Sequence, residues 1–120
     1  MNIIIDPEQV EQFREKYTVL ELDTIRIGAN DQVVTAYCVV ENIPVLELPL
    51  VESHRKLHHN LLENYRKKDW NFCQNAIDQL KGRWGGEVDS FYEDLSARLA
   101  KYEAQDPGEN WDGVIEKTIS

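Results

Sequence analysis

Cysteine is scarce in this sequence, with only Cys38 and Cys73 among the 120 residues. The two could pair in principle, but nothing in the sequence indicates an oxidising compartment or a disulfide-stapled scaffold. A chain of this length can bury a real hydrophobic core without such staples. We therefore expect two buried thiols, one on a strand and one on a helix face, in a single-domain cytoplasmic protein.

A long apolar run is absent as well. The N-terminal segment has three consecutive apolar residues, Ile3, Ile4 and Ile5, and no basic residue ahead of them. This composition is not typical of a signal peptide or of a membrane span. We expect no association with a membrane.

Basic residues are too few to balance the acidic ones. The sequence has 13 Lys and Arg against 22 Asp and Glu, which gives a net charge of -9. Nucleic-acid binding needs a basic surface to contact phosphates, so the composition argues against it. Mimicry of DNA by an acidic surface is disfavoured too, because the basic residues are interspersed among the acidic ones.

No catalytic or ligand-binding signature is present. The sequence has no Ser/His/Asp set and no Cys/His pair at plausible spacing. The segment 81–86 contains glycines and a lysine, but it lacks the residue order of a phosphate-binding loop and follows a predicted helix, not a strand. We predict that the protein is not an enzyme and needs no cofactor.

Three amphipathic segments, joined by short connections at residues 69–70 and 85–86, fill residues 57–102. Their apolar faces, read at the helical period, are Leu57, Leu61, Leu62 and Tyr65; Cys73, Ala76, Ile77 and Leu80; and Val88, Phe91, Tyr92, Leu95, Leu99 and Tyr102. Three such helices in a row most simply bury these faces against each other. We expect the second helix to end at residues 85–86 and the third at 106–108.

The N-terminal part predicts a helix and a β-hairpin. Asp6 and Pro7 are typical of a helix start, and Ile3 to Ile5 either add a short strand or simply lie over the core. Residues 18–27 and 33–40 are rich in β-branched side chains and flank a Gly/Asn/Asp turn. The apolar phase changes near Asp23, which predicts a bend or bulge. The second strand is apolar on both faces, and a hairpin alone leaves both of its edges unpaired.

These patterns together predict an α+β fold in a single domain of residues 1–120. Residues 1–45 hold the N-terminal helix and the hairpin, residues 46–105 the three helices, and residues 106–120 a tail. We expect residues 41–49 to form an extended connector, with Pro49 as the first residue of the long helix. Trp111 is expected to fold back onto the body of the protein.

Two stretches resemble the C-terminal end of class III adenylate and guanylate cyclases. Residues 22–28 and 32–37 resemble the closing β-hairpin of those enzymes. Residues 65–70 (Tyr-Arg-Lys-Lys-Asp-Trp), Pro107 and residues 111–114 (Trp-Asp-Gly-Val) resemble the tetratricopeptide-like helical tail that follows it in many members. The resemblance covers roughly residues 18–117 and implies that the three-helix half is tetratricopeptide-like.

The sequence also departs from that family. The cyclase metal-binding aspartates and transition-state residues lie upstream of the closing hairpin, and only seventeen residues precede Thr18 here. Cys73 stands where the tetratricopeptide repeat usually has alanine. The resemblance therefore implies a detached cyclase tail with an interaction role and without cyclase activity.

Three groups of residues are candidates for a site. His54 and His58 are one helical turn apart, which is metal-ligand spacing, but a partly buried structural role is the stronger interpretation. The span 53–68 has five basic residues and one acidic residue, so it carries +4 while the remainder carries -13. It could dock an acidic partner or simply solvate a helix. The interaction candidates are Arg55, Lys56, Arg66, Lys67, Lys68, Trp70, Trp84 and Trp111.

We predict a non-catalytic protein-interaction or regulatory module that binds a protein partner. That partner could be a second copy of the chain, which would make a homodimer. The dimer would form through the helices or through an open edge of the hairpin. The alternative is a small-ligand sensor with a pocket between hairpin and helices, lined by Tyr37, Trp70 and Trp84. A self-assembling structural component is a third interpretation.

Overall fold

The structure is a computed structural model that describes residues 2–27, 32–109, 111 and 113–117. The chain divides into two compact units, and each is described by itself below. The first comprises Met1–Glu41 with Asp112–Ser120, and the second comprises Asn42–Trp111. Together their elements confirm the predicted α+β class.

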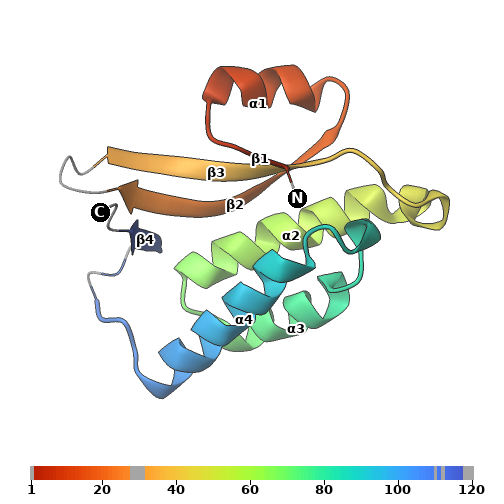
Figure 1. Cartoon of the computed structure of the whole chain (residues 1–120). Coiled ribbons are helices and arrows are strands. Elements are labelled where there is room, and N and C mark those ends of the chain that lie inside the picture. Colours follow the sequence, from red (N-terminus) through yellow and green to blue (C-terminus); the bar gives the residue numbers. More distant parts are fainter. Residues whose placement is uncertain (1, 28–31, 110, 112, 118–120) are drawn as a thin grey trace. The chain divides into compact units, whose positions relative to one another are not determined.

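The first unit is built on the predicted hairpin, formed by β2 (Thr18–Ile27) and β3 (Gln32–Val40) (Figure 1). The antiparallel register shifts between Glu21 and Thr24, which confirms the bulge expected near Asp23. Helix α1 (Pro7–Arg14) begins as predicted, because the side chain of Asp6 accepts a hydrogen bond from the backbone N–H of Glu8. The turn residues 28–31 lie outside the described residues.

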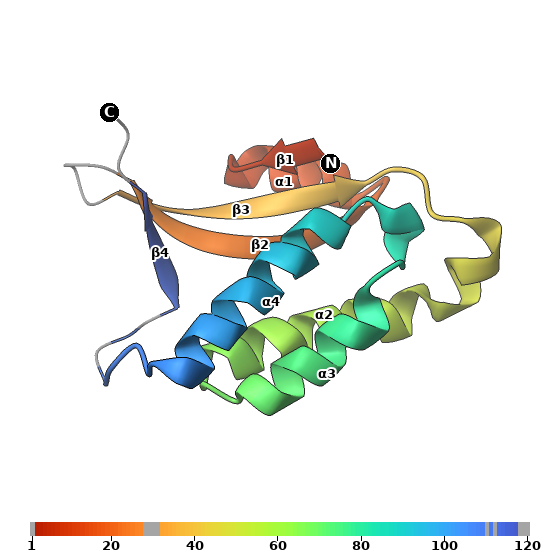
Figure 2. The same ribbon diagram turned by 60° about the horizontal axis from the view of Figure 1, so that its bottom comes forward.

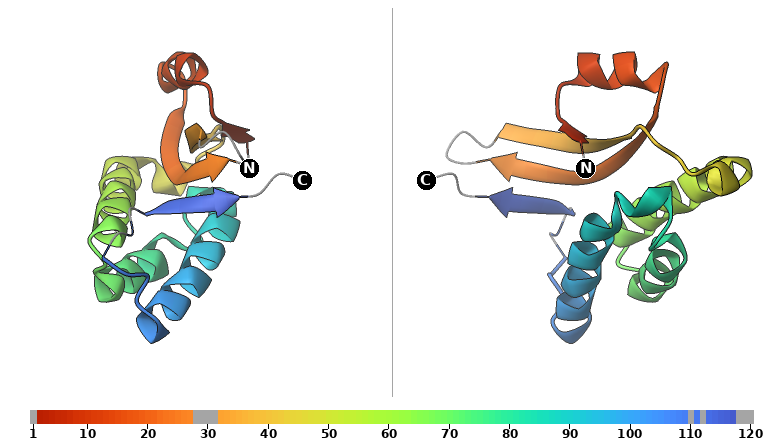
Figure 3. Two further views of the ribbon diagram at one scale, coloured as in Figure 1. Left: turned by 90° about the vertical axis from the view of Figure 1, so that its left-hand side faces the viewer. Right: turned by 45° about the vertical axis from the view of Figure 1, so that its right-hand side comes forward.

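Both edges of the hairpin carry a further strand, which corrects the expectation of an open hairpin. β1 (Asn2–Ile4) pairs antiparallel with residues 37–39 of β3, and β4 (Val114–Lys117) pairs parallel with residues 24–27 of β2. The strand order is β1-β3-β2-β4 (Figure 3). The strand β4 was not predicted, because four residues beyond a tail carry no periodic pattern that distinguishes a parallel edge strand.

The apolar residues of β3 are buried at one end of the strand and exposed at the other. Cys38, Val39 and Val40 are all buried, so the C-terminal end of the strand is covered on both faces, as expected. Val33 near the other end is 49% exposed. The expectation of two covered faces therefore fails for the first residues of this strand.

The second unit consists of three helices, α2 (Val51–Arg66), α3 (Trp70–Leu80) and α4 (Asp89–Ala104) (Figure 2). Every residue of the predicted apolar faces is buried except Leu57 and Tyr102, which are half-buried. Cys73 has no exposed surface, and its sulfur lies 3.6 Å from the carbonyl oxygen of Leu61 in α2. The small residue thus sits where the first two helices approach each other, as predicted.

Two short 3-10 helices stand where an extended connector and the end of the second helix were predicted. Residues 41–49 are not an extended connector, because η2 (Val45–Leu50) includes Pro49 and α2 begins only at Val51. The second long helix ends at Leu80, and residues 85–86 instead belong to η3 (Trp84–Gly86). The physical reason is one long-range contact between these two segments, described below. The third helix ends close to its predicted boundary.

Candidate interaction site

The turn η2 is held in place by its single charged residue, Glu47. The carboxylate of Glu47 accepts a hydrogen bond of 2.7 Å from the backbone N–H of Trp84 in η3, and the N–H of Glu47 itself donates to the carbonyl of Pro44 at 2.9 Å. A bond from an N–H to a carboxylate is stronger than one between neutral groups. The carboxylate therefore faces inward and fixes the turn against η3.

Trp84 donates this bond from a backbone conformation that a tryptophan rarely adopts. Its φ is 57°, in the left-handed region, and the following residues Gly85 (φ 65°) and Gly86 (φ 78°) share that region. A non-glycine residue held there costs on the order of 1–3 kcal/mol and persists only where its surroundings hold it. A Cβ at position 85 would also come within 3.4 Å of the carbonyl oxygen of Asn42. The hydrogen bond that Trp84 donates to Glu47 is one of the contacts that hold this strained segment.

A buried hydrogen-bond network holds the side chain of Trp84. Its indole nitrogen donates to the hydroxyl of Tyr92 in α4 at 3.1 Å, and that hydroxyl lies 2.9 Å from Nδ1 of His58 in α2. All three side chains are at most 2% exposed. Because an indole can only donate, the hydroxyl of Tyr92 accepts from it, and the same hydroxyl lies within hydrogen-bond distance of Nδ1 of His58. The network joins η3, α4 and α2.

The inward carboxylate leaves the apolar side chains of η2 pointing outward. Val45 is 79% exposed, Leu46 91%, Leu48 54% and Leu50 44%. We call these four residues the η2 apolar face. An ordinary surface turn has the opposite arrangement, with apolar residues inward and the carboxylate in water. Apolar surface gathered in one place, not scattered singly, is typical of an interaction site.

The η2 apolar face was not among the predicted site residues. Its sequence signal is a run of apolar residues between Pro44 and Pro49, interrupted only by Glu47. That pattern indicates a half-buried connector equally well. Only the contact of Glu47 with Trp84, 37 positions further along, determines which side of the turn faces outward.

The two candidate metal ligands contact aromatic side chains of the helical unit. His58 is buried in the network with Tyr92, and the ring of His54 makes an edge contact with the ring of Trp84 at 5.9 Å between centroids. Nδ1 of His54 is buried and has no hydrogen-bond partner among the described residues. Nowhere in the described part of the chain do three or more His, Cys, Asp or Glu residues gather as metal ligands would. The positions of both rings agree with the structural interpretation.

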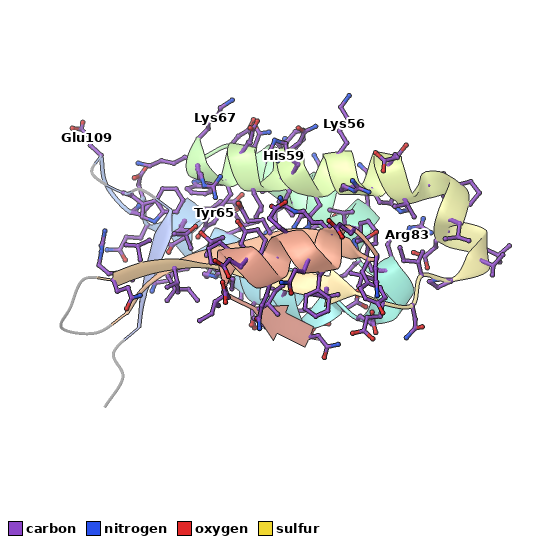
Figure 4. All side chains as sticks on the ribbon, turned by 90° about the horizontal axis from the view of Figure 1, so that it is seen from above. Lys56, His59, Tyr65, Lys67, Arg83 and Glu109 are labelled. Carbon is purple, nitrogen blue, oxygen red and sulfur yellow. The ribbon has the colours of Figure 1, made fainter. Side chains whose placement is uncertain are left out.

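The predicted basic residues differ in their interactions. Arg55 pairs with Glu52 at 2.9 Å, and Arg66 also has an interaction partner. Lys68 bonds the carboxylate of Asp106 at 2.9 Å and the carbonyl of Gly108 at 2.6 Å, so it fastens the segment that follows α4. The side chains of Lys56 and Lys67 point away from α2 into the solvent (Figure 4).

The pKa of the Asp106 carboxyl lies below its usual value of 3.8. The first cause is the hydrogen bond that it accepts from the backbone N–H of Gly108 at 2.8 Å, and the second is the bond from Lys68. Both bonds favour the charged carboxylate. This local cluster therefore positions the start of the tail.

Trp70 and Trp111 belong to an aromatic cluster with Tyr65 and Tyr102. The ring of Trp111 lies 5.0 Å from Tyr65, 5.5 Å from Trp70 and 5.4 Å from Tyr102, measured between centroids. Trp111 thus packs back onto the helices, as predicted. Cages for quaternary ammonium groups need space for the cation between the rings, whereas these rings contact each other directly. The cluster is a packed anchor for the tail.

Burial raises the pKa of the Tyr65 hydroxyl in this cluster to about 12, although the nearby Arg98 acts in the opposite direction. The guanidinium of Arg98 lies 5.9 Å from the centre of the Tyr65 ring and donates a long hydrogen bond of 3.4 Å to its hydroxyl. Tyr65 therefore stays neutral at physiological pH. Its role is to pack against the tail.

The three aromatic residues predicted for a sensor pocket have separate environments. Trp70 begins α3 and packs in the tail cluster, whereas Trp84 follows the end of α3 and bonds Tyr92. An 11-residue helix is about 16 Å long and separates Trp70 at its start from the segment beyond its end that contains Trp84. Tyr37 lies in the first unit, where the guanidinium of Arg14 is 5.8 Å from its ring centre.

The helices of the structure can be compared with what a membrane span requires. Among the described residues, no helix combines the length and the apolar character that crossing a bilayer requires.

Comparison with known proteins identifies no relative: the chain matches no protein-family model, no curated protein and no solved structure. The resemblance to cyclase tails therefore stays a prediction based on the sequence motifs.

Proposed function

We propose that this chain is a non-catalytic protein-interaction module of the cytoplasm that docks through the η2 apolar face. The single observation that carries the proposal is the inverted turn, in which the half-buried Glu47 is bonded to Trp84 and Leu46 is 91% exposed. Exposing these side chains to water is unfavourable, and a docked partner removes that cost. The segment is also anchored at a strained residue, so it can present the face with little loss of conformational freedom on binding.

Three further observations support this proposal over a chemical role. The histidines closest to metal-ligand spacing pack against Trp84 and Tyr92 inside the helical unit. The motifs at residues 65–70 and 111–114 are similar to a tetratricopeptide-like tail, which suits a module that contacts other proteins. Both cysteines are buried, and neither is part of a disulfide, which suits a reducing compartment.

The proposal is tested by placing a photo-crosslinking amino acid at position 46 and expressing the protein in its native cells. The matched control carries the same group at Lys67, which is also exposed but lies just beyond the opposite end of α2. We expect discrete covalent adducts from position 46 and none of the same mass from position 67. The adducts should disappear when Leu48→Ser is added. Equal adduct patterns at both positions, or none at either, would contradict the proposal.

A further inference from the structure

The charged residues that flank the η2 apolar face in the chain balance each other, because residues 44–56 contain Glu47 and Glu52 against Arg55 and Lys56. In the turn itself, the carboxylate of Glu47 is directed toward η3. In the first turn of α2, Glu52 and Arg55 form an ion pair at 2.9 Å, with both side chains at least half exposed. The whole chain, in contrast, carries -9. The apolar face is therefore a nearly neutral place on a strongly acidic protein.

A neutral apolar surface can pair with its own copy without bringing like charges together. Every charge on such a surface is duplicated in a two-fold pair, so a self-pairing surface must be close to neutral or carry both signs in register. The ion pair at the rim satisfies this condition, because Glu52 of one copy can accept from Arg55 of the other. A surface selected for an acidic or a basic partner would carry an excess of the opposite charge.

The size of the face suggests how strong such pairing is. Taking about 100 Å² for a fully exposed Val or Leu side chain, the four residues expose roughly 300 Å² per copy. Two copies then bury roughly 600 Å² of apolar surface, and the polar rim brings the total to about 1,000 Å². This is the low end of specific interfaces, typical of a weak and reversible dimer. It is too small for an obligate one.

We propose that the occupant of the η2 apolar face is a second copy of this chain, in a weak two-fold dimer centred on Leu46. This inference rests on the proposed function and specifies its partner. It also replaces the hairpin edge as the expected dimer contact, because β1 and β4 occupy part of both edges.

Sedimentation velocity of the purified chain tests the dimer, from about 2 to about 200 µM, a range that brackets weak association. We expect the mass to rise with concentration from 14.0 kDa toward twice that value. Leu46→Gln should raise the dimer Kd at least about tenfold, as expected for a central contact residue. The matched control Ile5→Gln removes an apolar side chain of 53% exposure outside the turn and should change Kd less than about twofold.

Salt and crosslinking separate this pairing from other occupants. Two copies of charge -9 repel each other, so raising the salt concentration should strengthen the dimer. Docking of an acidic protein on the basic helix would instead be weakened by added salt. Under mild oxidation, Leu46→Cys should form an intermolecular disulfide and Lys67→Cys should not. The far-UV circular dichroism of each variant must match that of the unmodified chain.

Each outcome decides between the two proposals. A chain that is monomeric at every concentration, or one whose dimer is weakened equally by Ile5→Gln, overturns the self-pairing. If the cellular crosslink from position 46 then has a mass other than twice that of the chain, the interaction module stands with a different partner. If neither dimer nor adduct is found, both proposals fail.

Discussion

The hydroxyl of Tyr92 is the most informative single atom to remove from the helical unit. Tyr92→Phe deletes the acceptor of the Trp84 indole N–H and the partner of Nδ1 of His58, and keeps the ring. All three side chains are at most 2% exposed, so water does not easily replace the lost partner. Leaving one buried polar group unsatisfied costs about 1–3 kcal/mol. With two such groups and partial relaxation, we expect the free energy of unfolding to fall by about 2–4 kcal/mol.

Urea unfolding followed by far-UV circular dichroism measures this loss, because the signal reports mainly on α2, α3 and α4. With an m-value of about 2 kcal/mol per molar, the midpoint should fall by roughly 1–2 M without a change in m. Tyr17→Phe is the matched control, since that tyrosine is 37% exposed and lies outside the helical unit. It should change stability by less than about 0.5 kcal/mol.

A double-mutant cycle sharpens the test. Adding His58→Leu to Tyr92→Phe removes one of the two unsatisfied groups, so the double variant should be less destabilised than the sum of the single variants. If Tyr92→Phe is as stable as the unmodified chain, or if the two effects simply add, the network does not hold the helices as we describe.

Four further predictions concern other parts of the chain. Cys73→Leu should overpack the crossing of α2 and α3 and cost about 1–3 kcal/mol in urea unfolding, whereas Cys73→Ala should be much milder; equal effects would show that the crossing lies elsewhere. Glu47→Ala should cost about 1.5–3 kcal/mol, because it removes a charged acceptor from the strained Trp84, and Glu47→Gln should recover part of this loss since its amide oxygen can still accept. The pKa of the Asp106 carboxyl, measured by NMR titration, should lie below 3.8, so its contribution to stability is present above that pH and is lost as the pH falls through the lowered pKa. Lys68→Ala should raise this pKa only in part, because the hydrogen bond from a backbone N–H is the larger cause. An unchanged pKa in this variant would contradict the contact between Lys68 and Asp106. Incubation with ATP or GTP and manganese should yield no cyclic nucleotide above a buffer blank, and turnover that survives repurification would refute the non-catalytic interpretation.

The sequence was sufficient to predict the helices and the hairpin, because these elements depend on local patterns. The apolar residues of α3, Cys73, Ala76, Ile77 and Leu80, recur at the helical period, and all four are buried. Both hairpin strands are rich in β-branched residues, and the change of phase near Asp23 marks the bulge. Such periodic patterns report which side of an element is buried, without reference to any distant residue.

The candidate site could not be predicted from the sequence, because it depends on contacts between distant positions. The composition of η2 allows either side of the turn to face outward, and the choice is made by Glu47 meeting a backbone N–H 37 residues away. His58 became a structural residue only when α4 placed Tyr92, 34 residues later, beside its ring. Likewise, β4 is a strand because the edge of β2 offers it unpaired backbone groups. Local pattern determines which residues an element buries, whereas hydrogen bonds across the fold determine which polar groups are satisfied inside and which apolar residues remain exposed.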